Sequence, residues 1–219
     1  MTENQNREFF NTPSEDIASS VIQALAAALA IGGLVALIYL ALPYGALPIT
    51  GVSVYGGTLI FAFLASALYH GVRHERVKRV FRTIDHCAIL LLIAGTYTPV
   101  AVIVLENQGG LTLLIAVWSI AIVGVSLRVF APRLFLKLRV AFYLAMGWLV
   151  VGWANPVIDG IGAWGASLFL AGGLAYSFGL IFYAWKRLPY NHAVWHLFVI
   201  AGSSCFYTAT MLFVIPGQA

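Results

Sequence analysis

Long apolar segments alternate with short polar ones along most of the chain. They cover residues 13–42, 49–72, 84–105, 111–129, 138–154, 163–185 and 192–214. Their lengths are close to the roughly 20 residues that a helix needs to cross the hydrocarbon core of a bilayer. The pattern predicts an all-α membrane protein, in which a polar tail at 1–12 precedes one domain at 13–216. We expect that domain to be a bundle of seven transmembrane helices.

The beginning of the first predicted helix carries a capping signature. Thr12 can act as the N-cap, Pro13 suits the first helical position, and Glu15 stands where a capping box needs a carboxylate. Asp16 adds a negative charge where the helix dipole favours one. We therefore expect the first helix to begin directly after Thr12.

The composition supports a membrane protein and excludes several other classes. Of the 219 residues, 61% are hydrophobic and only 9% are charged, which is far more apolar surface than a soluble domain of this size can bury. The net charge is +4, but no basic block with interleaved aromatic residues occurs, so we expect no nucleic-acid partner. Two cysteines without a Cys-x-x-Cys motif do not suggest a disulfide framework.

The basic residues predict the orientation in the membrane. All 12 except Arg7 fall between segments two and three, four and five, or six and seven. The residues concerned are Arg73, Arg76, Lys78, Arg79, Arg82, Arg128, Arg133, Lys137, Arg139, Lys186 and Arg187. Because positively charged loops stay on the cytoplasmic side, seven spans place the N-terminus in the cytoplasm and the C-terminus outside. We expect a multi-pass protein of a bacterial plasma (inner) membrane.

The five histidines all fall near the predicted cytoplasmic side. They are His70, His74, His86, His192 and His196. His192 and His196 are four residues apart, so a helix presents both from one face, and His70 lies at a similar depth. Buried imidazoles without partners are costly, and a metal ion would offset that cost. Three nitrogens and one water match an open zinc site, so we predict a Zn²⁺ ion held by His70, His192 and His196.

Two further polar residues are candidates for catalysis beside that metal. Asp85 is the one carboxylate within segments two to seven at this depth, and it could orient or deprotonate the metal water. Ser66 shares a helix face with His70 and could donate a hydrogen bond to the water or to a substrate carbonyl. Alternatively, Asp85 pairs with Arg82 or caps the third helix, and Ser66 is a small packing residue. His86 points about 100° away from Asp85 and is a weaker candidate ligand.

These motifs resemble the hemolysin III family of the progestin and adipoQ receptor (PAQR) superfamily. The resemblance is carried by Ser66-x-x-x-His70, by Ile84-Asp85-His86 followed by 93–99, and by His192-x-x-x-His196. It implies a seven-helix bundle with a zinc near the cytoplasmic side, held by three histidines, with the aspartate and the serine near the metal water. The superfamily includes adiponectin receptors and is similar to alkaline ceramidases. One departure is in the first helix.

In that helix, Ser19 stands where the family usually has asparagine, and Gln23 where it usually has histidine. The resemblance therefore leaves the role of the polar residues of the first helix open. It does not affect the three predicted zinc ligands.

Three hypotheses of function follow. The first is a zinc hydrolase that cleaves an amide or ester of a membrane lipid, as a ceramidase does, with a substrate that enters from the bilayer. The second is a non-enzymatic sensor or regulator of the membrane lipid state, in which the zinc is structural. The third is a cytolytic, hemolysin-like activity, which ranks last because no helix has the continuous polar stripe of a channel. Membrane lipids and zinc are the expected partners.

Overall fold

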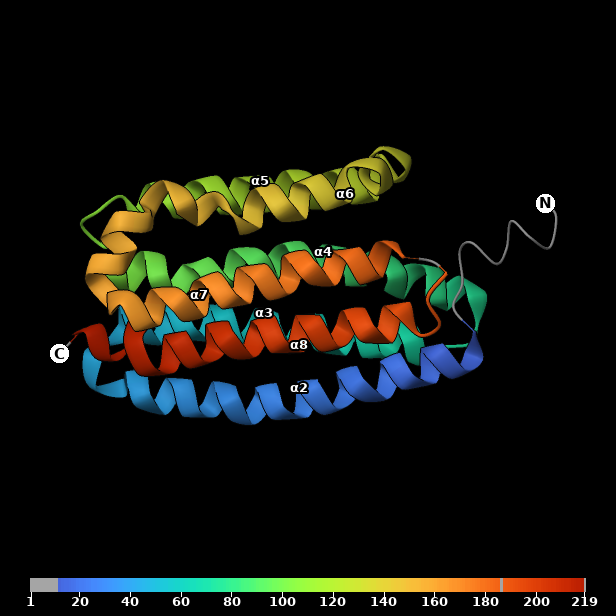
Figure 1. Cartoon of the computed structure of the whole chain (residues 1–219), viewed down its shortest axis with the longest axis horizontal. Helices are drawn as coiled ribbons and strands as arrows, with labels where there is room; N and C mark the ends of the chain where they lie inside the picture. The colour runs from blue at the N-terminus through green and yellow to red at the C-terminus, as the bar shows by residue number, and fades with distance from the viewer. Residues whose placement is uncertain (1–11, 186, 219) are drawn as a thin grey trace.

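The computed structural model describes residues 12–185 and 187–218, and in this part of the chain every regular element is helical (Figure 1). The long helices are α2 (Pro13–Ala41), α3 (Ala46–Gly71), α4 (Glu75–Pro99), α5 (Gly110–Phe130), α6 (Pro132–Gly147), α7 (Ala154–Ala184) and α8 (Asn191–Ala209). The predicted all-α class is therefore confirmed for the described residues. Apart from Thr12, the predicted tail lies outside them.

Six described segments are long and apolar enough to cross a membrane. One of them, Pro132–Ala184, contains both α6 and α7. Figure 1 shows that the chain reverses its direction between these two helices, near a 3-10 turn at Leu149–Trp153. The structure thus supports a multi-pass membrane protein with six candidate spanning segments, and the predicted count of seven spans stays a prediction.

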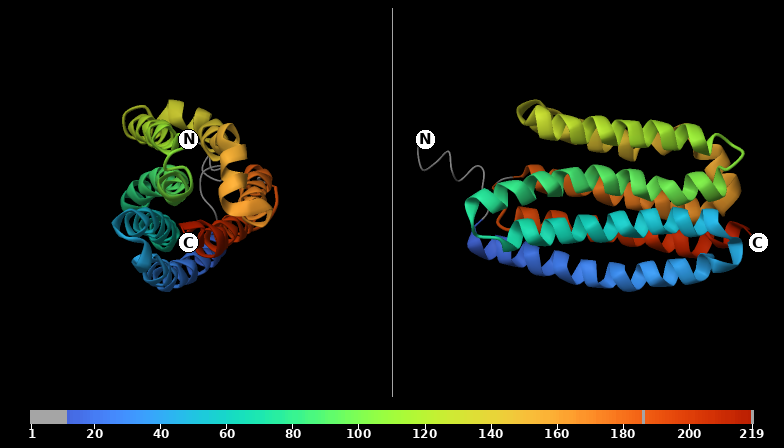
Figure 2. Two further views of the ribbon diagram at one scale, coloured as in Figure 1. Left: turned by 90° about the vertical axis from the view of Figure 1, so that its left-hand side faces the viewer. Right: turned by 180° about the vertical axis from the view of Figure 1, so that it is seen from behind.

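The helices surround a large, partly open cavity. α2 packs against α3 and α8, α4 lies between α3 and α5, and α7 packs against α8. Seen from one end, the helices form a ring (Figure 2). α6 and α7 are neighbours in this ring but contact one another little. The cavity inside has a volume of about 2070 Å³ and is lined mainly by α4, α6, α7 and α8. Ligand pockets usually have volumes of roughly 300–1,000 Å³, so this one is unusually large.

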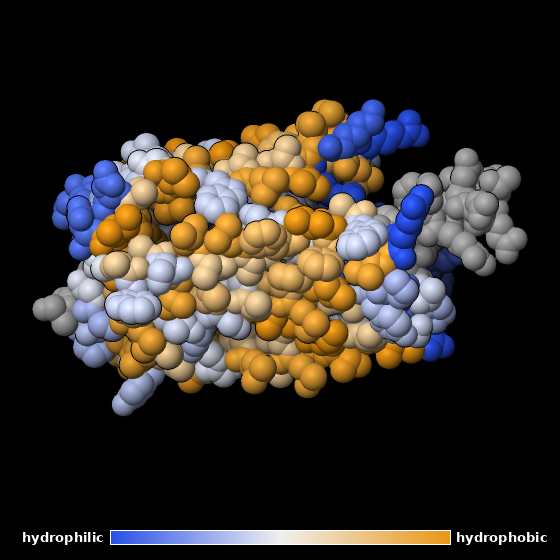
Figure 3. All heavy atoms as spheres, viewed as in Figure 1, coloured by the Kyte–Doolittle hydropathy of each residue, from blue (hydrophilic) through white to orange (hydrophobic). Residues whose placement is uncertain are grey.

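The outer surface is apolar along the length of the helices. Large side chains such as Leu29, Phe130 and Trp164 are more than three-quarters exposed, at 77%, 85% and 80%. On the face in Figure 3, strongly hydrophilic residues gather at the two ends of the bundle. This distribution fits a bundle whose sides contact lipid.

The helix boundaries differ from the apolar segments at one end of the bundle. α4 begins at Glu75, nine residues before the predicted 84, so Asp85 lies well inside a helix and the interpretation of Asp85 as a cap is wrong. Likewise, Arg128 is on α5 and Arg139 on α6 rather than in a loop. Arginine, lysine and glutamate are good helix formers, so the helices continue beyond the apolar segments that hydropathy detects.

The predicted capping box at the start of α2 is confirmed. The Glu15 N–H donates to Thr12 Oγ1 at 3.3 Å, and the Thr12 N–H donates to the Glu15 carboxylate at 2.8 Å. The other oxygen of Glu15 accepts the Tyr190 N–H at 2.7 Å. Because Tyr190 immediately precedes α8, this carboxylate fixes the beginning of α8 to the beginning of α2, close to His192.

Candidate metal centre

The three predicted ligands come together although they are distant in sequence. His70 is in the last turn of α3, and His192 and His196 are in the first two turns of α8. Their potential ligand atoms all lie within 4.8 Å of one another. The ring centroids are separated by 4.7 to 5.1 Å, and His70 and His196 are each only 3% exposed. The fold thus brings together three imidazoles, two buried and that of His192 partly buried, which could hold a metal ion.

The spacing of the nitrogens fits a tetrahedral ion. His196 Nε2 lies 3.2 Å from His70 Nε2. Zinc–nitrogen bonds of about 2.05 Å in tetrahedral geometry would place two ligand nitrogens about 3.3 Å apart. Three neutral imidazoles also form a donor set that zinc uses in open sites, where a fourth position remains for another ligand. The residues present therefore fit the predicted ion.

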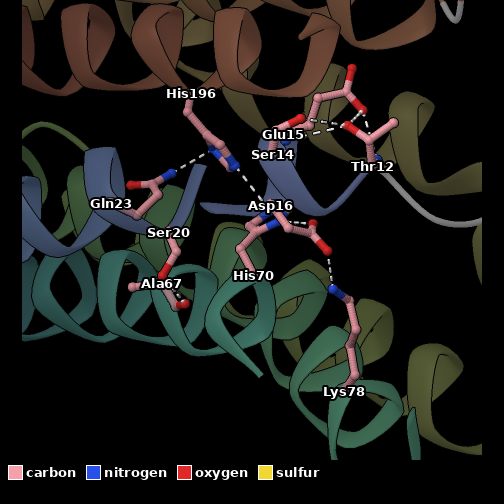
Figure 4. Close-up of polar contacts among 10 residues, drawn as sticks. All are labelled: Thr12, Ser14, Glu15, Asp16, Ser20, Gln23, Ala67, His70, Lys78 and His196. Carbon is pink, nitrogen blue, oxygen red and sulfur yellow. Dashed lines mark hydrogen bonds and ion pairs between the residues drawn. The ribbon is translucent and has the colours of Figure 1, made fainter. Parts of the chain in front are cut away.

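Asp16 orients the first ligand from α2. Its Oδ1 lies 2.9 Å from His70 Nδ1, and its other oxygen accepts a hydrogen bond from Lys78 Nζ (Figure 4). Both Asp16 and Lys78 are buried. A carboxylate on the far nitrogen of a histidine fixes the ring and makes it a stronger metal ligand. From the sequence alone, Asp16 is assigned only to the helix dipole, and this contact is not predicted.

Gln23 holds the second ligand from the same helix. Its amide nitrogen lies 2.5 Å from His196 Nδ1, in a buried position (Figure 4). Asp16, Ser19 and Gln23 are all buried and recur at spacings of three and four residues, so one face of α2 is turned towards the histidines. This polar face on an otherwise apolar helix is the signal that could have identified Asp16 and Gln23 from the sequence.

The hydrogen bonds form a continuous chain from Gln23 to Asp16. With the Gln23 amide nitrogen donating to His196 Nδ1, neutral imidazoles satisfy the chain when His196 Nε2–H donates to His70 Nε2 and His70 Nδ1–H donates to Asp16. In this arrangement the Gln23 Oε1 is buried and has no hydrogen-bond partner. A metal needs the lone pair of His196 Nε2, so the proton must lie on Nδ1 instead. Turning the Gln23 amide then lets its Oε1 accept that proton, which also satisfies the unpaired oxygen.

Asp85 and Ser66 lie at the same end of the cavity as the histidines. Both are buried, and both line the cavity together with His192 and His196. Ser66 and His70 are among the polar groups that interact with the Asp85 carboxylate, and Arg82 is another. Ser66 Oγ itself has no partner within ordinary hydrogen-bond geometry. Asp85 is not a member of the ligand group, so the structure places it beside the candidate metal site rather than in it.

The two other histidines lie elsewhere. His74 is exposed and immediately precedes α4, as expected for a loop residue. His86 is buried, and its Nδ1 accepts a hydrogen bond from Arg128 at 3.1 Å. Neither belongs to the group of potential ligands that the described residues form.

The fold and this site define a multi-pass helical membrane protein with a buried three-histidine centre. A family model described as "Haemolysin-III related" matches residues 12–207. The chain is 40% identical over 203 residues to Hemolysin-3 of Bacillus cereus, covering 92% of this chain and 93% of the relative. It is 38% identical over 205 residues to the Hemolysin-3 homolog of Bacillus subtilis (strain 168), covering 93% and 96%.

A more distant relative is the human Monocyte to macrophage differentiation factor. It is 30% identical over 169 residues, which cover 71% of this chain and 67% of the relative. The chain therefore belongs to the haemolysin III family, and the predicted place within the progestin and adipoQ receptor superfamily is confirmed.

Proposed function

We propose that this protein is a zinc hydrolase of the membrane, which cleaves an amide or ester bond of a lipid near the cytoplasmic side. The observation that carries the proposal is the group of His70, His192 and His196 at the end of a large, largely apolar cavity. A carboxylate, Asp85, and a hydroxyl, Ser66, face that cavity without belonging to the ligand set. This combination of ligands, proton acceptor and lipid-sized space is what such a reaction requires.

The roles of the residues follow from their positions. A zinc ion held by the three histidines would supply a Lewis acid and lower the pKa of water to about 7. Asp85 would accept a proton from the attacking water and pass it to the leaving group. Ser66 Oγ, which has no hydrogen-bond partner, would donate to the substrate carbonyl oxygen. The apolar side chains of α6 and α7 would hold the acyl chains, which would enter between these two helices because they contact one another little.

The proposal includes seven spans, with the beginning of the chain in the cytoplasm of a bacterium. α6 has 16 residues and is about 24 Å long, so with the 3-10 turn that follows it nearly matches a hydrocarbon core of roughly 30 Å. The connections α3–α4, α5–α6 and α7–α8 lie at the end of the bundle where α2 begins (Figure 1). These connections and the adjoining helical turns carry the basic residues, which favours a cytoplasmic location for that end.

Turnover by the purified, zinc-loaded protein tests the proposal. The substrates are fluorogenic lipid amides and lipid esters that differ only in the bond cleaved. We expect turnover that Asp85→Asn reduces by about 10²–10⁴-fold, the usual contribution of a general base, while zinc content stays unchanged. Equal turnover in wild type and Asp85→Asn, or no turnover of any substrate by protein that holds one zinc per chain, would refute the hydrolase.

A structural role for the zinc is the second candidate, because the ligands come from α3 and α8 and their outer contacts from α2. An ion there would fix three helices to one another and would catalyse no reaction, which suits a non-enzymatic regulator of the membrane state. Unfolding on chelation, together with the absence of lipid turnover, would favour this function.

Cytolysis is the third candidate. The name Hemolysin-3 belongs to the relatives. Leakage of vesicles at a physiological density of this protein would be needed to support cytolysis here.

A further inference from the structure

Three arginines from three different helices act electrostatically on one buried histidine. Arg82 lies on α4, Arg128 on α5 and Arg139 on α6, and all three interact electrostatically with His86. Arg128 Nε donates to His86 Nδ1 at 3.1 Å, and these two residues are only 8% and 7% exposed. The hydroxyl of Tyr143 donates to the His86 carbonyl oxygen at 3.4 Å and closes the cluster on the α6 side. We call these five residues the arginine cluster.

Arg128 and Arg139 have little negative charge near them. Asp16 pairs with His70 and Lys78 instead, and the contact of Arg128 among the described residues is with His86. Arg139 Nε is buried and has no hydrogen-bond partner. Arg128 is buried and Arg139 is partly buried, and cations in such positions that repel one another are costly unless an anion accompanies them.

The arginine cluster opens into the cavity. Arg82, His86, Arg139 and Tyr143 all line it, and the lining continues into apolar residues of α6 and α7. Arg79 and Arg187 add two further guanidinium groups to the lining. The carboxylates there are Glu15, Glu75 and Asp85.

These carboxylates do not neutralise Arg128 and Arg139. Glu15 is engaged by Thr12 and Tyr190, Glu75 is exposed, and Asp85 interacts with His70, Ser66 and Arg82. One end of the cavity is therefore cationic and lies beside an apolar space large enough for acyl chains.

We propose that the arginine cluster binds the phosphate of an anionic phospholipid whose acyl chains occupy the apolar part of the cavity. Guanidinium groups suit this ligand because their planar, multiple donors match the oxygens of a phosphate. The phosphate of a lipid and a free phosphate both present oxyanions to the arginines. Only a lipid would also fill the adjoining apolar space. The proposal concerns binding alone and holds whether or not the zinc centre catalyses a reaction.

The experiment compares two arginines of the same helix. Arg139→Gln removes a charge from the arginine cluster, whereas Arg133→Gln removes the same charge from an exposed position on α6. Each protein is placed in nanodiscs of phosphatidylcholine with a trace of phosphatidylglycerol, and the lipids that remain bound are quantified by native mass spectrometry. We expect wild type and Arg133→Gln to prefer phosphatidylglycerol, and Arg139→Gln to lose roughly tenfold or more of that preference, as expected for lost charge-assisted hydrogen bonds.

A second readout separates binding from a role in folding. In lipid-free detergent, Arg139→Gln should unfold at the same temperature as wild type or higher, because it relieves repulsion between buried cations, yet phosphatidylglycerol should no longer raise that temperature. A fall in unfolding temperature with unchanged lipid preference would overturn the proposal, as would equal losses of preference in both variants. If inorganic phosphate displaces phosphatidylglycerol at equal concentration, the cluster binds a free oxyanion and the lipid is refuted. If Arg139→Gln does not fold, Arg139→Lys is used in its place, because it keeps the positive charge but removes the guanidinium group. An unchanged preference of Arg139→Lys for phosphatidylglycerol would refute recognition by the guanidinium group.

Discussion

Replacing Gln23 by leucine should weaken metal binding without touching a ligand. Gln23 contacts His196 Nδ1 at 2.5 Å in a site where both residues are nearly inaccessible to water. Leucine has a similar volume but no polar group, so His196 Nδ1–H would remain buried without an acceptor when Nε2 binds the ion. An unpaired buried donor costs about 1–3 kcal/mol, which corresponds to roughly a 5- to 150-fold change in affinity. Loss of an outer contact of a metal-bound histidine typically costs about 10–100-fold in affinity, which agrees with this range.

The assay is a zinc competition titration of the detergent-purified protein against a chromophoric chelator. Ser20→Ala is the matched control, because Ser20 lies on the same helix and donates to the Ala67 carbonyl oxygen at 2.9 Å without contacting a histidine. We expect a weakening of about 10–100-fold for Gln23→Leu. The control should stay near wild type, and Gln23→His, which restores the residue usual in the family, should recover most of the affinity.

An unchanged zinc affinity in Gln23→Leu would refute this reasoning. So would an equal loss in Gln23→Leu and Ser20→Ala, since that result would indicate a general loosening of α2 rather than a lost partner for His196. Cobalt substitution adds a spectroscopic check, because the d–d absorption of a tetrahedral Co²⁺ site should shift in Gln23→Leu only if the ligand geometry changes.

Three further outcomes follow from the same structure. Asp16→Asn should weaken zinc affinity by roughly tenfold, measured in the same titration, because it removes the charge behind His70; unchanged affinity would contradict this role. Glu15→Ala should lower the free energy of unfolding by about 1–2 kcal/mol, measured in a mild-detergent denaturation, through loss of the capping box and of the Tyr190 contact. Gly179→Ala should cost about 1–3 kcal/mol in that assay, because its Cβ would lie 2.7 Å from Phe198 Cβ and crowd the α7–α8 interface; full stability would show that α7 can shift away.

The helices could be predicted from the sequence because a bilayer imposes length and apolarity on each span. The ends of the helices could not be predicted, because hydropathy does not detect the polar helical turns that extend beyond the apolar segments. α4 shows this most clearly, since it contains polar residues from Glu75 onwards and brings Asp85 into its interior. The apolar pattern already separates 138–154 from 163–185. It does not give the end of α6 at Gly147 or the kink inside α7 at Gly162, where φ is 70°.

The ligands could be predicted because histidines in an apolar segment are costly, and their depth and spacing agree. The residues that contact these histidines from behind could not be predicted, because they depend on which helices pack together. Asp16 and His70 are 54 residues apart, and Gln23 and His196 are 173 apart, so only the packing of α2 against α3 and α8 brings them together. The same holds for the arginine cluster, in which residues of α4, α5 and α6 meet around His86.

The metal content of the purified protein tests the central claim most directly. Wild type, His196→Ala and Asp85→Ala are purified in detergent without chelators, and zinc per chain is measured by mass spectrometry of the metal. We expect one zinc per chain in wild type and in Asp85→Ala, and its loss in His196→Ala, because His196 belongs to the ligand group and Asp85 does not. Folded wild type without stoichiometric metal would contradict the account, and the three histidines would then form a purely hydrogen-bonded network.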